Sequence, residues 1–155
     1  MFPDGFLLEK RIGCNVEAAS KKRILEQLGQ RLAESVPELT QDLVFDALLE
    51  RERLGSTGLG KGIALPHARM AQVDRAMGAF IKLPEGIDFD ALDGSPVDLA
   101  FAMLVPEAAT DEHLQLLSKL ASMFSDSVFC ETLRKAETDH ELYQLILKRE
   151  SAIAT

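Results

Sequence analysis

The sequence predicts an α/β fold in which a mixed β-sheet has helices packed on its faces. Segments with helical periodicity occupy both ends of the chain, whereas the middle contains short apolar runs separated by turns. One of these runs, Val97 to Val105, is almost continuously apolar, which is typical of a buried central strand. No linker or repeat divides the chain, so we expect one domain over residues 1–155, with an ordered core over about 5–149.

Two helices are expected before the main strands. They span about Lys21 to Glu34 and about Gln41 to Leu54, because aliphatic residues recur in both at three- to four-residue spacing. Ser20 and Thr40 precede these helices, and each can cap a helix N-terminus through its side-chain oxygen. Gly55 follows the second helix directly and suits the C′ position that ends it.

Strands are expected wherever a short apolar or alternating run lies between turn residues. The predicted turns are Pro84–Gly86 and Asp93–Pro96, which are rich in the residues that reverse a chain. The predicted strands are Phe6–Leu8, Ile63–Leu65, Met77–Leu83, Ile87–Phe89 and Val97–Val105.

The remainder of the chain is predicted to be helical. A helix over Asp111 to Phe124, capped by Thr110, is followed by a short helix over Val128 to Lys135. Thr138 is expected to cap a last helix, and the tail Ser151–Thr155 is expected to be frayed.

Composition narrows the class of protein. A chain of 155 residues with 46% hydrophobic and 27% charged residues is ordinary for a globular protein. A net charge of −8 argues against general nucleic-acid binding, which needs a basic face, and fits a partner with a basic surface. No apolar run approaches the roughly 20 residues of a membrane span, and no signal peptide is evident. Cys14 and Cys130 are therefore expected to be reduced, in a cytoplasmic protein.

The stretch Gly55 to Arg69 is the candidate functional segment, because a glycine-rich loop leads into a short apolar strand and then to Pro66 and His67. The segment almost matches a nucleotide-binding P-loop. However, Gly62 stands where that motif needs Ser or Thr, and this loop follows a helix and opens a strand instead of the reverse. We therefore do not expect a nucleotide site.

The chain has three histidines, of which His140 is expected on the surface. His113 lies in the first turn of a predicted helix, where backbone N–H groups favour negative charge. His67 and His113, together with an arginine, would suit a phosphoryl group better than a metal, since no metal-binding spacing is present. A neutral imidazole accepts a phosphoryl group near pH 7, and an arginine fork binds phosphate oxygens.

Backbone N–H groups of a glycine-rich loop can also point at phosphate oxygens. The loop residues assigned this role are Ser56, Thr57, Gly58 and Gly60.

The residues Arg51 to Ala68, RERLGSTGLGKGIALPHA, resemble the active-site signature of the type-2 enzyme IIA (fructose/mannitol IIA) proteins of the phosphoenolpyruvate-dependent phosphotransferase system. Further stretches, PVDLAFAMLVP and HLQLLSKLASMF among them, look like the nitrogen-regulatory (PtsN-like, IIA-Ntr) branch of that family. The resemblance implies a mixed sheet of about five strands with helices on both faces. It also implies that His67 is the phosphorylated nucleophile, through Nε2, with Arg51 and His113 as the other active-site residues.

The resemblance further implies an HPr-like phosphocarrier (NPr) as the phosphoryl donor and no cofactor or metal. Regulated partners would include a potassium transporter or a sensor kinase. The protein would be a monomer or weak dimer that does not insert into a membrane. It would be a phosphocarrier component rather than a stand-alone metabolic enzyme. Arg53 and Arg69 are second choices after Arg51, expected on the surface or facing a partner. Two alternatives stay open: a sugar-transporter IIA component that passes phosphate to a IIB domain, and a binding module that has lost phosphorylation.

Overall fold

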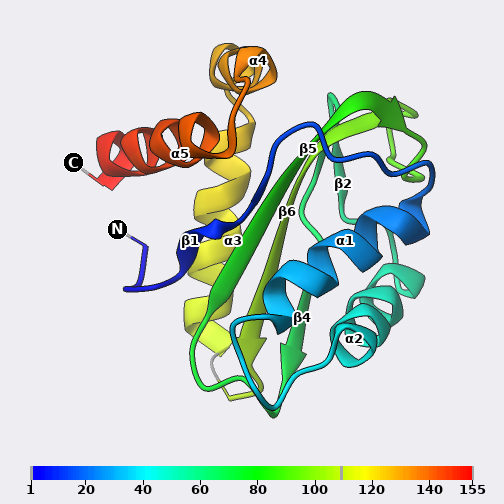
Figure 1. Ribbon diagram of the computed structural model, residues 1–155, viewed down its shortest axis with the longest axis vertical. Coiled ribbons are helices and arrows are strands. Elements are labelled where there is room, and N and C mark those ends of the chain that lie inside the picture. Colours follow the sequence, from blue (N-terminus) through cyan, green and yellow to red (C-terminus); the bar gives the residue numbers. More distant parts are fainter. Residues whose placement is uncertain (1, 109, 155) are drawn as a thin grey trace.

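The computed structural model of the protein describes residues 2–108 and 110–154. Within these residues a six-stranded mixed sheet lies between two layers of helices (Figure 1), which confirms the predicted α/β fold. The strands are β1 (Leu7–Gly13), β2 (Gly58–Gly60), β3 (Ile63–Ala64), β4 (His67–Met70), β5 (Met77–Ile87) and β6 (Val97–Pro106). The helices are α1 (Lys21–Ala33), α2 (Gln41–Arg53), α3 (Thr110–Phe124), α4 (Ser127–Lys135) and α5 (Asp139–Ala154).

Strand β6 is the centre of the sheet. The strand order is β1-β5-β6-β3-β2, with β4 also paired to β6. β5 pairs with β6 in the antiparallel direction, whereas β1 runs parallel to β5, and both β3 and β4 run parallel to β6. The near-continuous apolar run that predicted a buried strand therefore belongs to the strand with the most neighbours.

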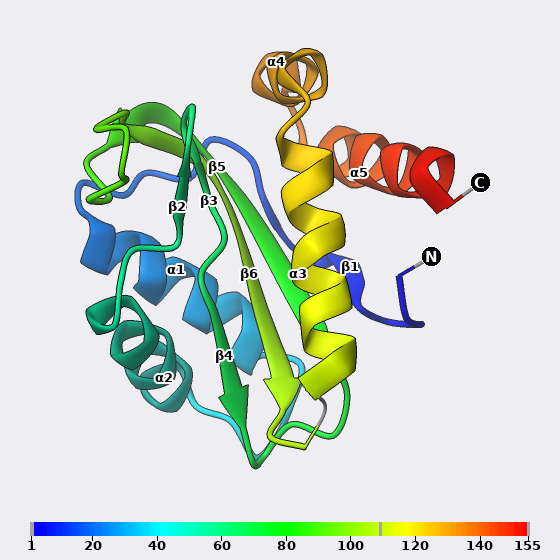
Figure 2. The same cartoon turned by 180° about the vertical axis from the view of Figure 1, so that it is seen from behind.

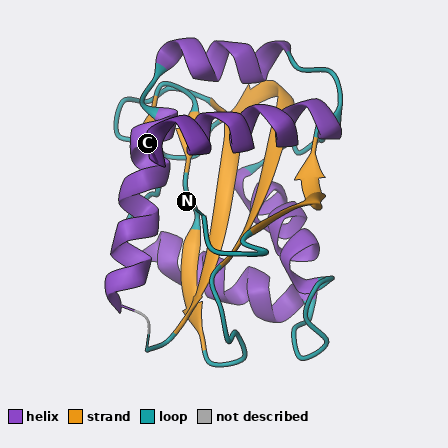
Figure 3. Ribbon diagram, turned by 90° about the vertical axis from the view of Figure 1, so that its left-hand side faces the viewer, coloured by secondary structure: helices purple, strands orange, loops and turns teal. Residues whose placement is uncertain are grey.

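From Leu99 to Val105, residues of β6 alternate between two hydrophobic cores, one on each face of the sheet. Helices α1 and α2 cover one face, and α3, α4 and α5 cover the other (Figure 1). Figure 3 views the α3–α5 layer from outside, with the strands behind it. The β6 residues in the core under α3–α5 are Leu99, Phe101, Met103 and Val105. Those in the core under α1 and α2 are Val97, Ala100, Ala102 and Leu104.

The N-terminal helix boundaries agree with the prediction to within one residue. The Ser20 hydroxyl oxygen accepts a hydrogen bond from the Arg23 N–H at 3.2 Å, and Thr40 Oγ1 accepts one from the Leu43 N–H at 3.1 Å. Both predicted caps are confirmed, and each satisfies a backbone donor that the helix itself leaves unpaired.

The C-terminal helices differ from the prediction in three details. Helix α3 begins at Thr110 rather than after it, and the predicted capping by the Thr110 side chain lies outside the described side chains. Helix α4 is capped by Asp126, whose carboxylate accepts from two backbone N–H groups. Helix α5 continues to Ala154, so the fraying expected from Ser151 is wrong up to that residue, and Thr155 is not described.

The predicted turn at Pro84–Gly86 is wrong, because β5 does not reverse there. Its pairing with β6 shifts between Lys82 and Ile87, so the exposed residues Pro84–Gly86 bulge out of the ladder. Pairing with β6 resumes at Ile87. The separate strand expected over Ile87–Phe89 is accordingly absent from the described structure, apart from Ile87 itself.

A tight hairpin joins β3, which the sequence predicted, to β2, which it did not predict. β2 and β3 are antiparallel, with Gly60 opposite Ile63, and only Lys61 and Gly62 lie between them. Both of these residues have positive φ, 57° and 88°, which is the type I′ geometry that matches strand twist. Half of the glycine-rich loop is therefore a β-hairpin rather than an open loop.

Strands β3 and β4 behave as one strand that is interrupted at Leu65 and Pro66. Ile63 pairs with Leu99 and His67 with Met103, so the same register along β6 is kept on both sides of the interruption. The Pro66 carbonyl still accepts a hydrogen bond from the Met103 N–H at 2.9 Å, although proline has no N–H of its own to donate. His67 thus begins β4, whereas the sequence placed it after the end of a strand.

Candidate functional site

His67 is the first residue of β4, the strand that lies between α2 and α3 in Figure 2. Its ring is half-buried, and its Nδ1 lies 2.8 Å from the Leu65 carbonyl oxygen. Because a carbonyl only accepts hydrogen bonds, Nδ1 carries the proton and donates it. The lone pair of the neutral ring is consequently on Nε2, which fixes the nitrogen that can act as a nucleophile.

His113, from the first turn of α3, stands against His67. The two ring centroids are 5.3 Å apart and the rings are nearly perpendicular, at 89°. The structure therefore brings together two histidines that are far apart in the sequence. His113 is only 6% exposed, so its ring is held by its surroundings.

Arg69 contacts the second histidine from the same strand as the first. Residues two apart in a strand share a face, so Arg69 projects on the same side as His67, while Ala68 and Met70 enter the core under α1 and α2. Arg69 Nε donates to His113 Nδ1 at 3.4 Å. An acceptor nitrogen carries no proton, so the proton of neutral His113 is on Nε2.

The environment of the two rings disfavours their protonation. Burial lowers the pKa of His67 most, and the charges of Arg51 and Arg69 lower it further, against the opposing effects of the Leu65 carbonyl and Glu52. Burial also lowers the pKa of His113, followed by the effects of His67, Arg69 and Arg51. A neutral imidazole keeps its lone pair, so the lowered pKa leaves His67 able to act as a nucleophile at neutral pH.

Arg51, in the last turn of α2, shares two surface hollows with His67. One hollow, of about 390 Å³, is also lined by Ser56, Thr57 and Gly58. The other, of about 560 Å³, includes Arg69 and His113. Arg51 Nη1 donates to the Gly55 carbonyl at 2.8 Å, which leaves other guanidinium N–H groups for a ligand.

The backbone N–H groups of the loop after α2 are already engaged. The Glu52 carboxylate is buried and accepts from both the N–H and the hydroxyl of Thr57. The Gly58 N–H donates to the Ser56 hydroxyl oxygen at 3.0 Å. A phosphate that used the Thr57 or Gly58 N–H groups would have to displace these partners. Gly60 lines neither hollow and lies instead at the end of the β2–β3 hairpin.

Glu52 also joins the loop to the first helical layer. Lys21 Nζ lies 3.0 Å from Glu52 Oε1, which compensates the charge of the buried carboxylate. This role of Glu52 is not evident from the sequence, because its partners Lys21 and Thr57 become its neighbours only in the folded chain.

Of the other arginine and histidine candidates, Arg69 belongs to the site, whereas Arg53 and His140 contact residues elsewhere. Arg69 is exposed, as expected, but its contact with His113 makes it part of the site. The two-residue spacing of His67 and Arg69 indicates that both side chains lie on one face, but only once His67–Met70 is known to be a strand. Arg53 is exposed and pairs with Glu50, and His140 is exposed and contacts Glu9.

Over residues 2–108 and 110–154, no group of three or more His, Cys, Asp or Glu side chains is arranged to hold a metal ion. Within the same described ranges, no helix combines the length and the apolar character needed to cross a membrane. Cys14 and Cys130 are both free thiols in the structure.

The arrangement predicts how the two histidines titrate. In NMR titrations, both ring midpoints should lie below the ordinary value of 6.5, because burial and nearby arginines disfavour the imidazolium. The Arg69→Gln variant removes one cation, so both midpoints should rise, while burial should still hold them below that value. Midpoints that stay unchanged in Arg69→Gln, or that lie above 6.5 in the wild type, would contradict this account of the site.

The chain matches one protein family over most of its length. The family profile described as "Phosphoenolpyruvate-dependent sugar phosphotransferase system, EIIA 2" matches residues 5–149. The chain is 47% identical over 133 residues to a nitrogen regulatory protein of Pseudomonas aeruginosa, with 86% of each chain covered.

Solved structures agree with this assignment. The crystal structure of the nitrogen regulatory protein IIA-Ntr from Neisseria meningitidis matches with a TM-score of 0.86 and 46% identity, covering 90% of this chain and 95% of that one. The mannitol IIA of Escherichia coli matches with a TM-score of 0.74 and 25% identity, over 88% of this chain and 95% of its own. The chain therefore belongs to the type-2 EIIA family of the phosphoenolpyruvate-dependent phosphotransferase system, and its similarity is greatest to nitrogen regulatory members among these relatives.

Proposed function

We propose that the protein accepts a phosphoryl group on His67 Nε2 from an HPr-like phosphocarrier (NPr) and regulates partner proteins according to its phosphorylation state. The observation that carries this proposal is the hydrogen bond from His67 Nδ1 to the Leu65 carbonyl, which leaves Nε2 as the nucleophilic nitrogen. Arg51 lines the same hollows as His67, and His113 lies against it, so both can contact the transferred group.

In the proposed step, the Nε2 lone pair attacks phosphorus, a P–N bond forms, and the bond between phosphorus and the donor's leaving group breaks. Charge then concentrates on the three oxygens of the transferred group. Arg51 would bind these oxygens with its guanidinium N–H groups, and His113 would donate its Nε2 proton as a hydrogen bond. The loop residues Ser56, Thr57 and Gly58 would add contacts only after exchanging their present partners.

The surface around the site supports docking of a protein donor. Exposed leucines line the two hollows that meet at His67, and large exposed apolar side chains gathered around a reactive group are typical of a protein contact surface. We infer that the phosphocarrier docks over this rim. The leucines concerned are Leu54, Leu59, Leu92 and Leu114.

The identity to nitrogen regulatory relatives supports a regulatory role over a sugar relay that passes phosphate to a IIB domain. A potassium transporter or a sensor kinase is the kind of target that we propose, with the protein acting in the cytoplasm as a monomer or weak dimer. Because the histidine and its neighbouring arginine and histidine are all in place, we favour a working phosphocarrier over a module that has lost phosphorylation.

Phosphorylation of His67 can be tested by intact-mass analysis. After incubation with phosphoenolpyruvate, enzyme I and an HPr-type carrier, the wild type should gain one acid-labile phosphoryl group, and the His67→Ala variant should gain none. His140→Ala is the matched control, since His140 is an exposed histidine far from the site in the chain, and it should be labelled like the wild type. Labelling that survives in His67→Ala would refute the proposal.

The role of Arg51 can be separated from general charge effects by a neighbouring arginine. Arg51→Gln should slow phosphoryl transfer by about 100-fold, because it removes a donor to the developing negative charge. Arg53→Gln removes the same charge two residues along α2, from an exposed side chain paired with Glu50, and should leave the rate nearly unchanged. Equal rates for the two variants in a rapid-quench labelling assay would show that Arg51 has no specific role.

A further inference from the structure

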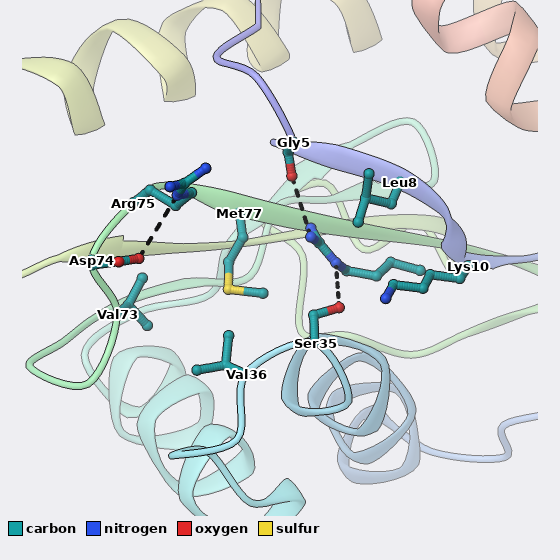
Figure 4. A pocket seen from close by; sticks show the side chains of 10 residues that line it. Gly5, Leu8, Lys10, Ser35, Val36, Val73, Asp74, Arg75 and Met77 are labelled. Carbon is teal, nitrogen blue, oxygen red and sulfur yellow. Dashed lines mark hydrogen bonds and ion pairs between the residues drawn. The ribbon is translucent and has the colours of Figure 1, made fainter.

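A third hollow, of about 310 Å³, lies at the β1 edge of the sheet. Residues of β1, of the segment that links α1 to α2, and of the loop between β4 and β5 line it (Figure 4). None of its lining residues lines the hollows around His67. It is therefore separate from the site around His67.

A buried cation without a counter-charge forms part of this hollow. Arg11 is only 4% exposed, and its guanidinium donates to the carbonyls of Phe6, Gly78 and Gly5 and to the Ser35 hydroxyl. All four partners are uncharged, and no Asp or Glu among the described residues forms an ion pair with Arg11. Buried charges in proteins are normally paired with an opposite charge.

A shortage of carboxylates does not explain this missing counter-charge. The protein has 25 acidic residues against 17 lysines and arginines, so carboxylates are abundant. Burial lowers the pKa of Arg11, and no acidic neighbour acts to raise it. An anion in the adjoining hollow would supply the charge that the chain does not.

Two further cations stand at the rim of the hollow. Figure 4 shows Lys10 and Arg75 on opposite sides of it, with Met77 between them. Lys10 is exposed and forms no ion pair with any residue that the structure describes. The only acidic lining residue is Asp74, which is 3.8 Å from Arg75 and largely exposed. Three cations and one anion therefore give the hollow a net positive charge.

The floor of the hollow is apolar, which restricts the kind of anion. Leu8, Val36, Val73 and Met77 supply aliphatic surface, and the last two are almost fully buried. A bare inorganic anion would leave this surface uncovered, whereas a short hydrocarbon chain would cover it. The volume is at the lower end of the range for ligand pockets, which suits a small metabolite.

We propose that this hollow binds a small carboxylate with a short aliphatic body. The carboxylate would lie near Arg11 and Lys10 and balance the buried guanidinium charge, and the aliphatic body would pack on Met77 and Val36. Arg75 would add charge from the opposite rim.

The proposal can be tested by an NMR titration of the full-length protein at constant ionic strength. Butyrate should cause saturable shifts of the backbone amides of Leu8, Lys10 and Val36. Butyramide has the same shape without the charge, and inorganic phosphate has charge without the aliphatic body, so both should bind at least about tenfold more weakly. No saturable shift with butyrate, or equal binding of either comparison compound, would overturn the proposal.

Variants at the rim test the same claim without disturbing the buried arginine. Lys10→Gln and Arg75→Gln should each weaken butyrate binding about fivefold, because each removes one partly exposed charge near the ligand. Arg23→Gln removes an exposed arginine from α1 outside this hollow and should leave the dissociation constant unchanged. If all three variants bind butyrate equally, the cations of the hollow do not hold the ligand and the proposal fails.

Discussion

The hydrogen bond from His67 to the Leu65 carbonyl determines what this site can do, and the interrupted strand β3–β4 makes the bond available. The Pro66 carbonyl points toward β6, where it accepts from Met103. The Leu65 carbonyl, in the interruption between β3 and β4, accepts from the imidazole of His67 instead. A backbone held in register along the central strand therefore sets the tautomer of the His67 ring.

A second set of contacts holds the segment that approaches this ring. Glu52 stands at the end of α2, binds Thr57 through its carboxylate and pairs with Lys21 at the start of α1. The Thr57 carbonyl in turn accepts from the Leu65 N–H at 3.0 Å. One buried carboxylate thus links the helix that carries Arg51 to the strand that leads to His67. His67 and Arg51 are thus positioned by connected backbone and side-chain bonds rather than by separate loops.

The sequence predicted what depends on local chemistry. The predictions were correct for the caps Ser20 and Thr40, for the two N-terminal helices and for the central strand β6. These features depend on a hydroxyl before a helix and on the spacing of apolar residues, which both act over a few residues. The short strands β2 and β4 were not predicted, because pairing with β3 and β6 rather than local propensity makes them strands. The residues at Pro84–Gly86 have turn chemistry but bulge from β5, since the strand pairs with β6 again beyond them.

The candidate site shows the same division. Resemblance to a known signature singled out His67, Arg51 and His113, and the structure places them together. Spacing alone could not have joined His67 to His113, because the contact arises from the packing of α3 against the sheet. The contact of Arg69 with His113 and the role of Glu52 follow from the same tertiary packing. For Arg69 there is a local cause as well, since the strand predicted from the sequence ends at Leu65 and β4 begins beyond Pro66.

The position of the phosphoryl group on the imidazole ring tests this account most directly. NMR of the phosphorylated, ¹⁵N-labelled protein distinguishes attachment at Nε2 from attachment at Nδ1 through the phosphorus–nitrogen coupling of the ring. The account predicts phosphorylation at Nε2 of His67, with Nδ1 still protonated and bonded to the Leu65 carbonyl. Phosphorylation at Nδ1 would require that bond to break and would contradict the claim that the interrupted strand selects the nucleophilic nitrogen.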